Sequence, residues 1–129
     1  MRKDLEERLI HFAASVLSLC RDMDKNDITK HFTNQLIRSS SSSAMNYGEA
    51  QGAESKRDFI HKVSIVLKEL RESHVNIRIM KEGKLFREEQ LITYLQKESN
   101  ELISIFYKTL QTARKNQAPK TEGHASWSV

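Results

Sequence analysis

The sequence has 129 residues, enough for one domain with a hydrophobic core, and it carries a net charge of only +4. This modest basic bias permits nucleic-acid binding without requiring it. The single cysteine, Cys20, excludes an internal disulfide, and the charged N-terminus and the lack of an apolar run of ~18 residues predict a cytoplasmic protein without a signal peptide or membrane span.

The first helix is expected at about residues 3–22. Apolar side chains recur there at three- and four-residue steps, which is the spacing of one helix face. The inward set is Leu5, Leu9, Phe12, Ala13, Val16, Cys20 and Met23. Because Cys20 falls on this face, we interpret it as a small buried side chain rather than a nucleophile.

The second helix is expected at about residues 28–49, and its apolar face is thin. The positions on that face are Phe32, Leu36, Ser40, Ser43 and Tyr47. The serine run at 39–43 has two interpretations, a flexible linker or a helix whose small side chains let a neighbour pack close. The helical periodicity continues on both sides of the run, which favours the helix.

The third helix is expected at about residues 56–81, with Ser55 as its N-cap and Asp58 as the acidic residue of a capping pair. Its apolar face comprises Phe59, Ile60, Val63, Val66, Leu67, Leu70, His74 and Ile77. A lone histidine on such a face is usually a core residue with one satisfied hydrogen bond, so His74 is not expected to be catalytic.

The fourth helix is expected at about residues 86–115, with Leu91, Leu95, Ser99, Leu102, Phe106, Leu110 and Ala113 facing inward. Four amphipathic helices with short connections predict an all-α, antiparallel up-down-up-down bundle that spans residues 1–116. Residues 117–129, which include Pro119 and Trp127, are expected to form a disordered tail.

Motifs for enzymatic chemistry are absent from the sequence. A di-metal bundle needs paired Glu-x-x-His motifs, and only a single Asp-x-x-His occurs, at Asp58 and His61. No glycine-rich phosphate loop or nucleophile elbow is present. We therefore expect no catalytic residues, no metal, no cofactor and no small-molecule substrate.

Two polar stripes suggest a subunit interface. Helix two carries Gln35, Arg38, Ser42, Asn46 and Glu49 on one flank, and helix three carries Ile65, Glu69, Glu72, Asn76 and Ile79 on the side expected to face away from the core. On the second stripe, the apolar residues Ile65 and Ile79 lie on either side of the two carboxylates. This arrangement favours a subunit interface over a surface that is simply exposed to solvent. We expect Arg38 to pair with Glu69, directly or through Asn46 and Glu49, and so to help specify an oligomer.

The basic excess is concentrated in residues 55–85. The candidate nucleic-acid contacts in this segment are Lys56, Arg57, Lys62, Lys68 and Arg71. We interpret these positions as spread around the helix. In one subunit such a distribution is only a weak signal for nucleic-acid binding. In a symmetric ring the patch would be repeated, and weak contacts would add.

The segments Gln-Leu-Ile-Arg-Ser at 35–39 and Ser-Ser-Ala-Met-Asn-Tyr-Gly-Glu-Ala at 42–50 resemble the second helix of a bacterial family. Its members are four-helix-bundle proteins encoded in intervening sequences of 23S ribosomal RNA genes. Residues 55–62 and 64–72 resemble the third helix, and the resemblance covers about residues 5–115. Relatives more often place an Ile-Ala pair around Ser43 and Ala44, and here the serine-rich stretch replaces it.

The resemblance implies a homopentameric ring and an association with RNA, and it implies no established enzymatic activity. The family's polar positions correspond to Arg38, Asn46, Glu49 and Glu69. Our leading hypothesis is a non-enzymatic, ring-forming bundle that binds RNA or a ribonucleoprotein partner through a repeated basic surface. The alternative is a protein–protein scaffold that binds no nucleic acid.

Overall fold

The computed structural model describes residues 2–87 and 89–116, and this part of the chain forms four α-helices and no β-strand. The helices are α1 (Arg2–Arg21), α2 (Asp27–Gln51), α3 (Lys56–Glu82) and α4 (Glu89–Asn116). The all-α prediction is confirmed, and the bounds of α1, α2 and α3 agree closely with those expected. The predicted tail at 117–129 and Trp127 lie outside the described residues.

The predicted start of the fourth helix is wrong, because α4 begins at Glu89 and not at Phe86. Helix α3 ends in a turn in which the N–H of Leu85 donates to the carbonyl of Met80 at 3.1 Å. Lys84 adopts the left-handed backbone conformation that this type of helix end requires, with φ of 54°. Leu85 and Phe86 pack against the core, so they connect the helices instead of starting α4.

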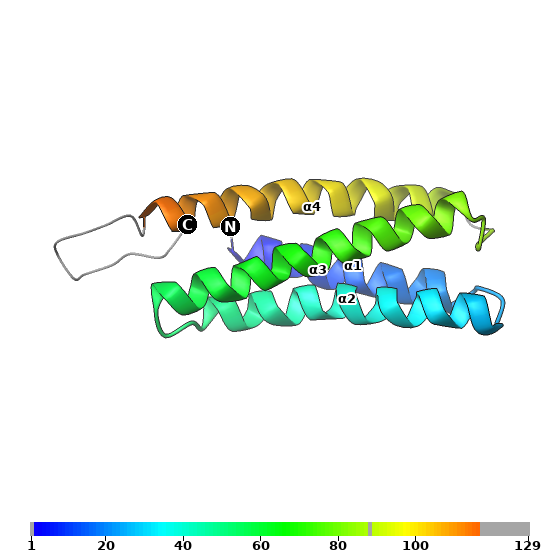
Figure 1. Cartoon of the computed structure of the whole chain (residues 1–129), viewed down its shortest axis with the longest axis horizontal. Coiled ribbons are helices and arrows are strands. Elements are labelled where there is room, and N and C mark those ends of the chain that lie inside the picture. Colours follow the sequence, from blue (N-terminus) through cyan, green and yellow to red (C-terminus); the bar gives the residue numbers. More distant parts are fainter. Residues whose placement is uncertain (1, 88, 117–129) are drawn as a thin grey trace.

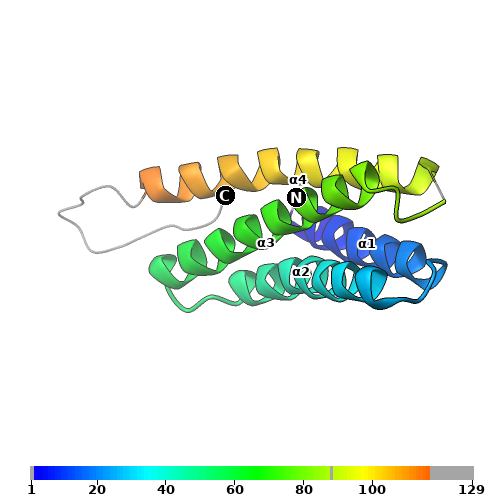
Figure 2. The same cartoon turned by 45° about the vertical axis from the view of Figure 1, so that its right-hand side comes forward.

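The chain reverses direction at each connection, as Figure 1 shows along the long axis and Figure 2 shows after a 45° turn. Close backbone contacts join α1 to α2, α2 to α3, α3 to α4 and α4 to α1, whereas neither diagonal pair makes such contacts. The side of the bundle formed by α3 and α4 therefore lies opposite the side formed by α1 and α2.

Side-chain caps fix two of the helix starts. The Asn26 side chain accepts a hydrogen bond from the N–H of Thr29 at 2.9 Å, and Ser55 Oγ accepts one from the N–H of Asp58 at 3.0 Å. Each cap satisfies a backbone donor that has no partner within the helix. The predicted Ser55 cap is confirmed.

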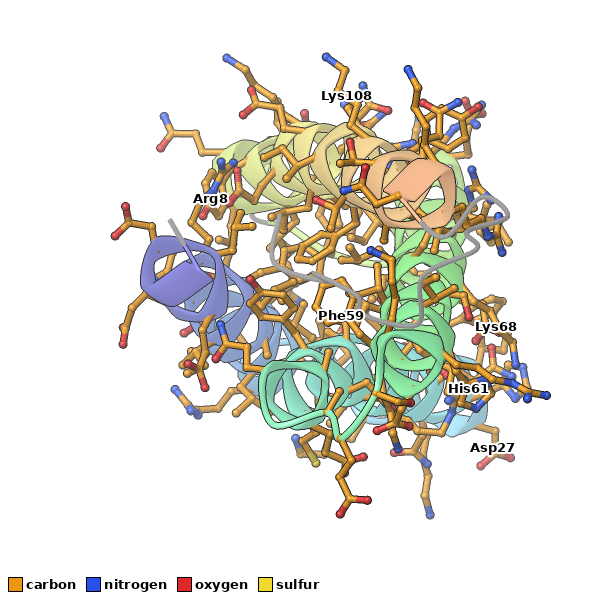
Figure 3. All side chains as sticks on the ribbon, turned by 90° about the vertical axis from the view of Figure 1, so that its left-hand side faces the viewer. Arg8, Asp27, Phe59, His61, Lys68 and Lys108 are labelled. Atoms are coloured by element: carbon orange, nitrogen blue, oxygen red, sulfur yellow. The ribbon has the colours of Figure 1, made fainter. Side chains whose placement is uncertain are left out.

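The core runs along the whole bundle and contains residues from every helix. Phe12, Leu36, Leu70 and Phe106 are fully shielded from solvent, and Phe59 points toward the centre of the bundle in Figure 3. The rings of Tyr47 and Phe106 meet edge to face with their centroids 5.1 Å apart, a favoured aromatic geometry. The expected burial of Leu70 is confirmed.

The serine run lies within α2 and is helical throughout, so the linker interpretation is wrong. Ser39, Ser40 and Ser43 are buried, and their hydroxyls donate to carbonyls one turn earlier in the helix. The hydroxyl oxygens of Ser39 and Ser73 lie 2.7 Å apart across the α2–α3 contact. Small side chains that satisfy their own hydroxyls let α2 and α3 pack closely, and this pair has the most extensive contact in the bundle.

Candidate nucleic-acid interface

The predicted pairing of Arg38 with Glu69 occurs, and it joins α2 to α3 within one chain. Arg38 Nη1 donates to Glu69 Oε1 at 3.2 Å, and Arg38 Nη2 donates to Glu72 Oε1 at 2.8 Å. The hydrogen bond to Glu72, and then the charge of Glu69, raise the pKa of Arg38 above its ordinary value. Arg38 therefore compensates two carboxylates of α3.

The outward orientation expected for the helix-three stripe is wrong in part. Glu69 and Asn76 are only 7% exposed, because they lie at the contact between α2 and α3. Asn76 Nδ2 donates to the carbonyl of Phe32 at 3.2 Å. Ile79, 48% exposed, faces solvent as expected, whereas Ile65 is half-buried.

A matching arrangement joins α1 to α4 through Arg8. Its guanidinium donates to Glu98 through Nε at 3.0 Å and Nη2 at 2.7 Å, and Nη2 also contacts Glu101 at 3.2 Å. Hydrogen bonding to Glu98 raises the pKa of Arg8. Figure 3 places Arg8 between α1 and α4. Two carboxylates of α3 thus share one arginine from α2, and two carboxylates of α4 share one arginine from α1.

Several exposed lysines and arginines of α3 and α4 lie outside these pairs. We define the cationic face as the exposed residues Arg57, Lys68, Arg71 and Arg78 of α3 with Lys97, Lys108, Arg114 and Lys115 of α4. Within residues 2–87 and 89–116, none of these side chains forms an ion pair. In Figure 3, Lys68 and Lys108 extend away from the core on adjoining sides of the bundle.

The predicted basic residues of α3 lie on several sides of the helix, but the four cations of this face share one side. Arg57, Lys68, Arg71 and Arg78 are separated by 11, 3 and 7 residues, which places them on one side of an α-helix. Exposed carboxylates at Glu82 and Glu89 lie beyond the row, at the α3–α4 connection. The outer side of α3 is consequently positive over most of its length.

Two of the candidate contacts do not belong to this face. Lys56 is buried, with 6% of its surface exposed, and Lys62 Nζ donates to Glu49 at 2.6 Å. The sequence analysis missed Arg78, Lys97, Lys108, Arg114 and Lys115. A count of the basic residues in the last helix would have found all of these except Arg78. The place of Arg78 in the α3 row follows from its spacing of seven residues from Arg71.

A shallow polar groove of about 400 Å³ separates the two rows of cations near Arg78 and Lys97. His74, Thr93, Gln96 and Asn100 complete its lining. Such a groove offers two positive side chains and several hydrogen-bonding groups, a combination that suits a phosphate group.

His74 has the satisfied hydrogen bond expected of it. His74 Nδ1 lies 2.8 Å from Ser99 Oγ, and Ser99 Oγ donates to the carbonyl of Gln96 at 3.0 Å. Burial and then the charge of Arg78 lower the pKa of His74, which favours a neutral imidazole at pH 7. Ser99 is fully buried and its proton is already used, so this pair lacks the accessible nucleophile of a hydrolase.

Two further chemical expectations concern the metal and the membrane. Among the described residues, no cluster of three or more His, Cys, Asp or Glu side chains could hold a metal ion. No helix in the same part of the chain is long and apolar enough to cross a membrane.

An uncharged surface lies on the opposite side of the bundle. Residues 9–20 of α1 and 39–48 of α2 contain no Asp, Glu, Lys or Arg. Exposed apolar side chains occur there at Ile10, Leu17 and Met45. A second apolar patch lies along the α2–α3 groove, where Val75 and Ile79 are about half exposed. Exposed apolar patches of this kind mark contact surfaces.

The comparison with known families is decisive for classification. The sequence profile of the 23S rRNA-intervening sequence proteins matches residues 4–108, which is most of the bundle. The chain belongs to this family. No curated protein matches the chain.

A solved structure supports the same fold for this 23S rRNA-intervening sequence protein. The crystal structure is of a protein of unknown function from the S23 ribosomal protein family of Bacteroides thetaiotaomicron. It matches with a TM-score of 0.74 and 22% identity, and the match covers 83% of this chain and 98% of that one.

The polar positions implied by the resemblance, Arg38, Asn46, Glu49 and Glu69, do not form one network. Asn46 Nδ2 donates to the carbonyl and hydroxyl oxygens of Ser42, on its own helix. Glu49 binds Lys62 and not Arg38. Of the expected polar site, the structure joins Arg38 to Glu69 and Glu72 across the α2–α3 contact. It joins Asn46 to Ser42 only within α2.

Proposed function

We propose that this protein is a non-enzymatic, ring-forming homo-oligomer that binds RNA or a ribonucleoprotein through the cationic face. The supporting observation is the set of exposed cations on each of two adjacent helices, none of which forms an ion pair within residues 2–87 and 89–116. Lysines and arginines that neutralise phosphates release condensed counterions, which is the main source of such affinity. The family description, which refers to 23S rRNA, is consistent with this role.

Two separate apolar patches support a ring rather than a twofold dimer. The α1 patch consists of Ile10 and Leu17, and the α3 patch consists of Val75 and Ile79 beside the groove lined by Phe32. When two different patches meet, the contact is heterologous, and repeated heterologous contacts form a ring where the rotation between subunits closes. A pentamer, as the family resemblance implies, would repeat the exposed cations of α3 and α4 five times, so that weak contacts add. Arg71, which lines the same groove as Val75 and Ile79, would lie beside the subunit contact.

The same patches favour a second function, a scaffold that binds another protein and no nucleic acid. In that case the cationic face would serve only solubility. Binding to RNA therefore separates the two proposals.

A filter-binding titration against structured RNA at several salt concentrations tests the first proposal. The logarithm of the binding constant should fall linearly with the logarithm of salt concentration. The double variant Lys68→Glu/Lys97→Glu should bind at least about tenfold more weakly, because it replaces phosphate contacts with repulsion.

The control is Lys25→Glu/Lys30→Glu, which makes the same change in net charge at exposed positions outside the cationic face. This control should bind within about twofold of the wild type, allowing for its long-range charge effect. Absence of binding at low salt would refute RNA binding. Equal losses of RNA affinity in both double variants would show that binding depends on the net charge of the protein and not on the cationic face.

A further inference from the structure

We infer that the RNA bound by the cationic face is a duplex, contacted along its phosphate backbones over about one helical turn. This inference rests on the proposed function and specifies its ligand. Three features of the face support it: its length and rigidity, its lack of a stacking platform, and the uncharged polar side chains between its cations.

The face is long, straight and rigid. From Arg57 to Arg78 the α3 row spans about 32 Å at ~1.5 Å per residue, which is on the order of one turn of a nucleic-acid duplex. Helix α4 runs antiparallel to α3, and the two helices converge toward their connection, where Arg78 and Lys97 line one groove. At this end of the bundle, cations from two helices can contact both phosphate backbones of a duplex.

Single-stranded RNA is usually held by aromatic side chains on which two or three bases stack. Two tyrosines of α4, Tyr94 and Tyr107, are exposed. The ring of Tyr94 meets His11 edge to face, and the hydroxyl of Tyr107 accepts a hydrogen bond from Gln111 at 3.1 Å. Phe59 and Phe106, the phenylalanines of the same helices, are buried in the core. The face therefore offers phosphate contacts without a platform for unpaired bases.

Uncharged polar side chains lie beside and between the cations of α4. Thr93, Asn100 and Ser104 are exposed, and none of them makes a side-chain hydrogen bond within the described residues. The minor groove of an RNA duplex is wide and shallow and presents 2′-hydroxyls, which such side chains can bind. The minor groove of B-form DNA is narrow, about 6 Å wide, and it lacks this hydroxyl. The geometry thus favours RNA over DNA duplexes.

The test measures fluorescence anisotropy with three probes of one sequence: a 20-base-pair RNA duplex, one of its strands chosen to be unstructured, and the DNA duplex. We expect the RNA duplex to bind about tenfold more tightly than the single strand at ~100 mM salt. The variant Asn100→Ala/Ser104→Ala should weaken binding to the RNA duplex and leave binding to the DNA duplex unchanged. Tyr107→Ala should change every affinity by less than about twofold, because no base stacks on it.

The outcomes separate this inference from the proposed function. If the single strand binds as tightly as the duplex, or if Tyr107→Ala weakens its binding severalfold, duplex recognition is refuted and RNA binding stands. If RNA and DNA duplexes bind equally and Asn100→Ala/Ser104→Ala affects neither, recognition of the 2′-hydroxyl is refuted. If no RNA binds at low salt, the proposed function fails as well. Circular dichroism of each variant confirms that the helices are intact.

Discussion

Arg38 and Glu69 are bonded to each other although one is largely exposed and the other is largely buried. The side chain of Arg38 is 58% exposed and that of Glu69 is 9% exposed, with 3.2 Å between Nη1 and Oε1. A carboxylate shielded from water needs a charged or hydrogen-bonding partner, because desolvation disfavours its ionised form. Arg38 supplies this partner from the solvent side of the α2–α3 contact.

Removal of this arginine should destabilise the bundle. Arg38→Ala should lower the free energy of unfolding by about 1–2 kcal/mol, between the ~0–1 kcal/mol of a surface ion pair and the ~3–5 kcal/mol of a fully buried one. Urea denaturation measures the change. Glu72→Gln, at a 42% exposed partner of the same arginine, should cost well under about 1 kcal/mol. Equal losses in the two variants would mean that the burial of Glu69 has no energetic consequence.

Leu70 is a probe of the core because it is completely buried in α3. Leu70→Ala should reduce the free energy of unfolding by about 2–5 kcal/mol, since it removes apolar contacts and leaves a cavity. Chemical denaturation of Ile28→Ala provides the comparison, because Ile28 is 63% exposed and should contribute little. A Leu70 variant as stable as the Ile28 variant would show that this face of α3 is not packed.

The two apolar patches should be required for assembly. Leu17→Glu and Ile79→Glu should each convert the oligomer to monomers without loss of helical circular dichroism, because each introduces a charge into a desolvated contact. Sedimentation velocity measures the mass. Ile28→Glu, an equivalent change outside both patches, should leave the oligomer intact.

An equimolar mixture of the Leu17→Glu and Ile79→Glu proteins tests whether the contact is heterologous. Each variant keeps one intact patch, so the mixture should form a heterodimer that cannot close into a ring. Two monomers in the mixture, or a monomeric wild type, would contradict the proposed ring.

His74 should make stability depend on pH. Because burial lowers its folded-state pKa, the unfolded chain binds more protons below the ordinary pKa of about 6.5, and stability should fall as pH decreases through that value. Thermal unfolding of the wild type and of His74→Gln at several values between pH 7.5 and 5.5 measures this. The variant should lose less stability on acidification, whereas His61→Gln, at an exposed histidine, should behave like the wild type. Parallel pH profiles for wild type and His74→Gln would refute this role.

Cys20 should react slowly with thiol reagents in the folded protein. Burial raises the pKa of its thiol to about 11, which leaves very little thiolate at neutral or mildly alkaline pH. The rate of modification at pH 8 should increase at least about a hundredfold when the chain is unfolded in urea, as the thiol returns to a pKa near 8.5. Similar rates in both states would show that the thiol is not protected.

The sequence by itself determined the helices and the residues that they bury. Spacing of three and four residues selects one side of a helix whatever lies next to it, so the burial of Leu36, Tyr47 and Leu70 could be predicted. The cap at Ser55 is equally local, because it involves groups three residues apart. Even the serine run follows this rule, since its periodicity matches the helix on both sides.

Only the tertiary structure decided which charges are paired and which are free. Arg38 meets Glu69 across 31 residues, and Arg8 meets Glu98 across 90, and these contacts depend on the order and rotation of the helices around the core. The same rotation turned Glu69 and Asn76 toward α2, and it turned Lys68 and Lys97 toward solvent. Helical spacing fixes the relative directions of side chains on one helix, but the direction that faces a neighbour is set by packing of the whole bundle.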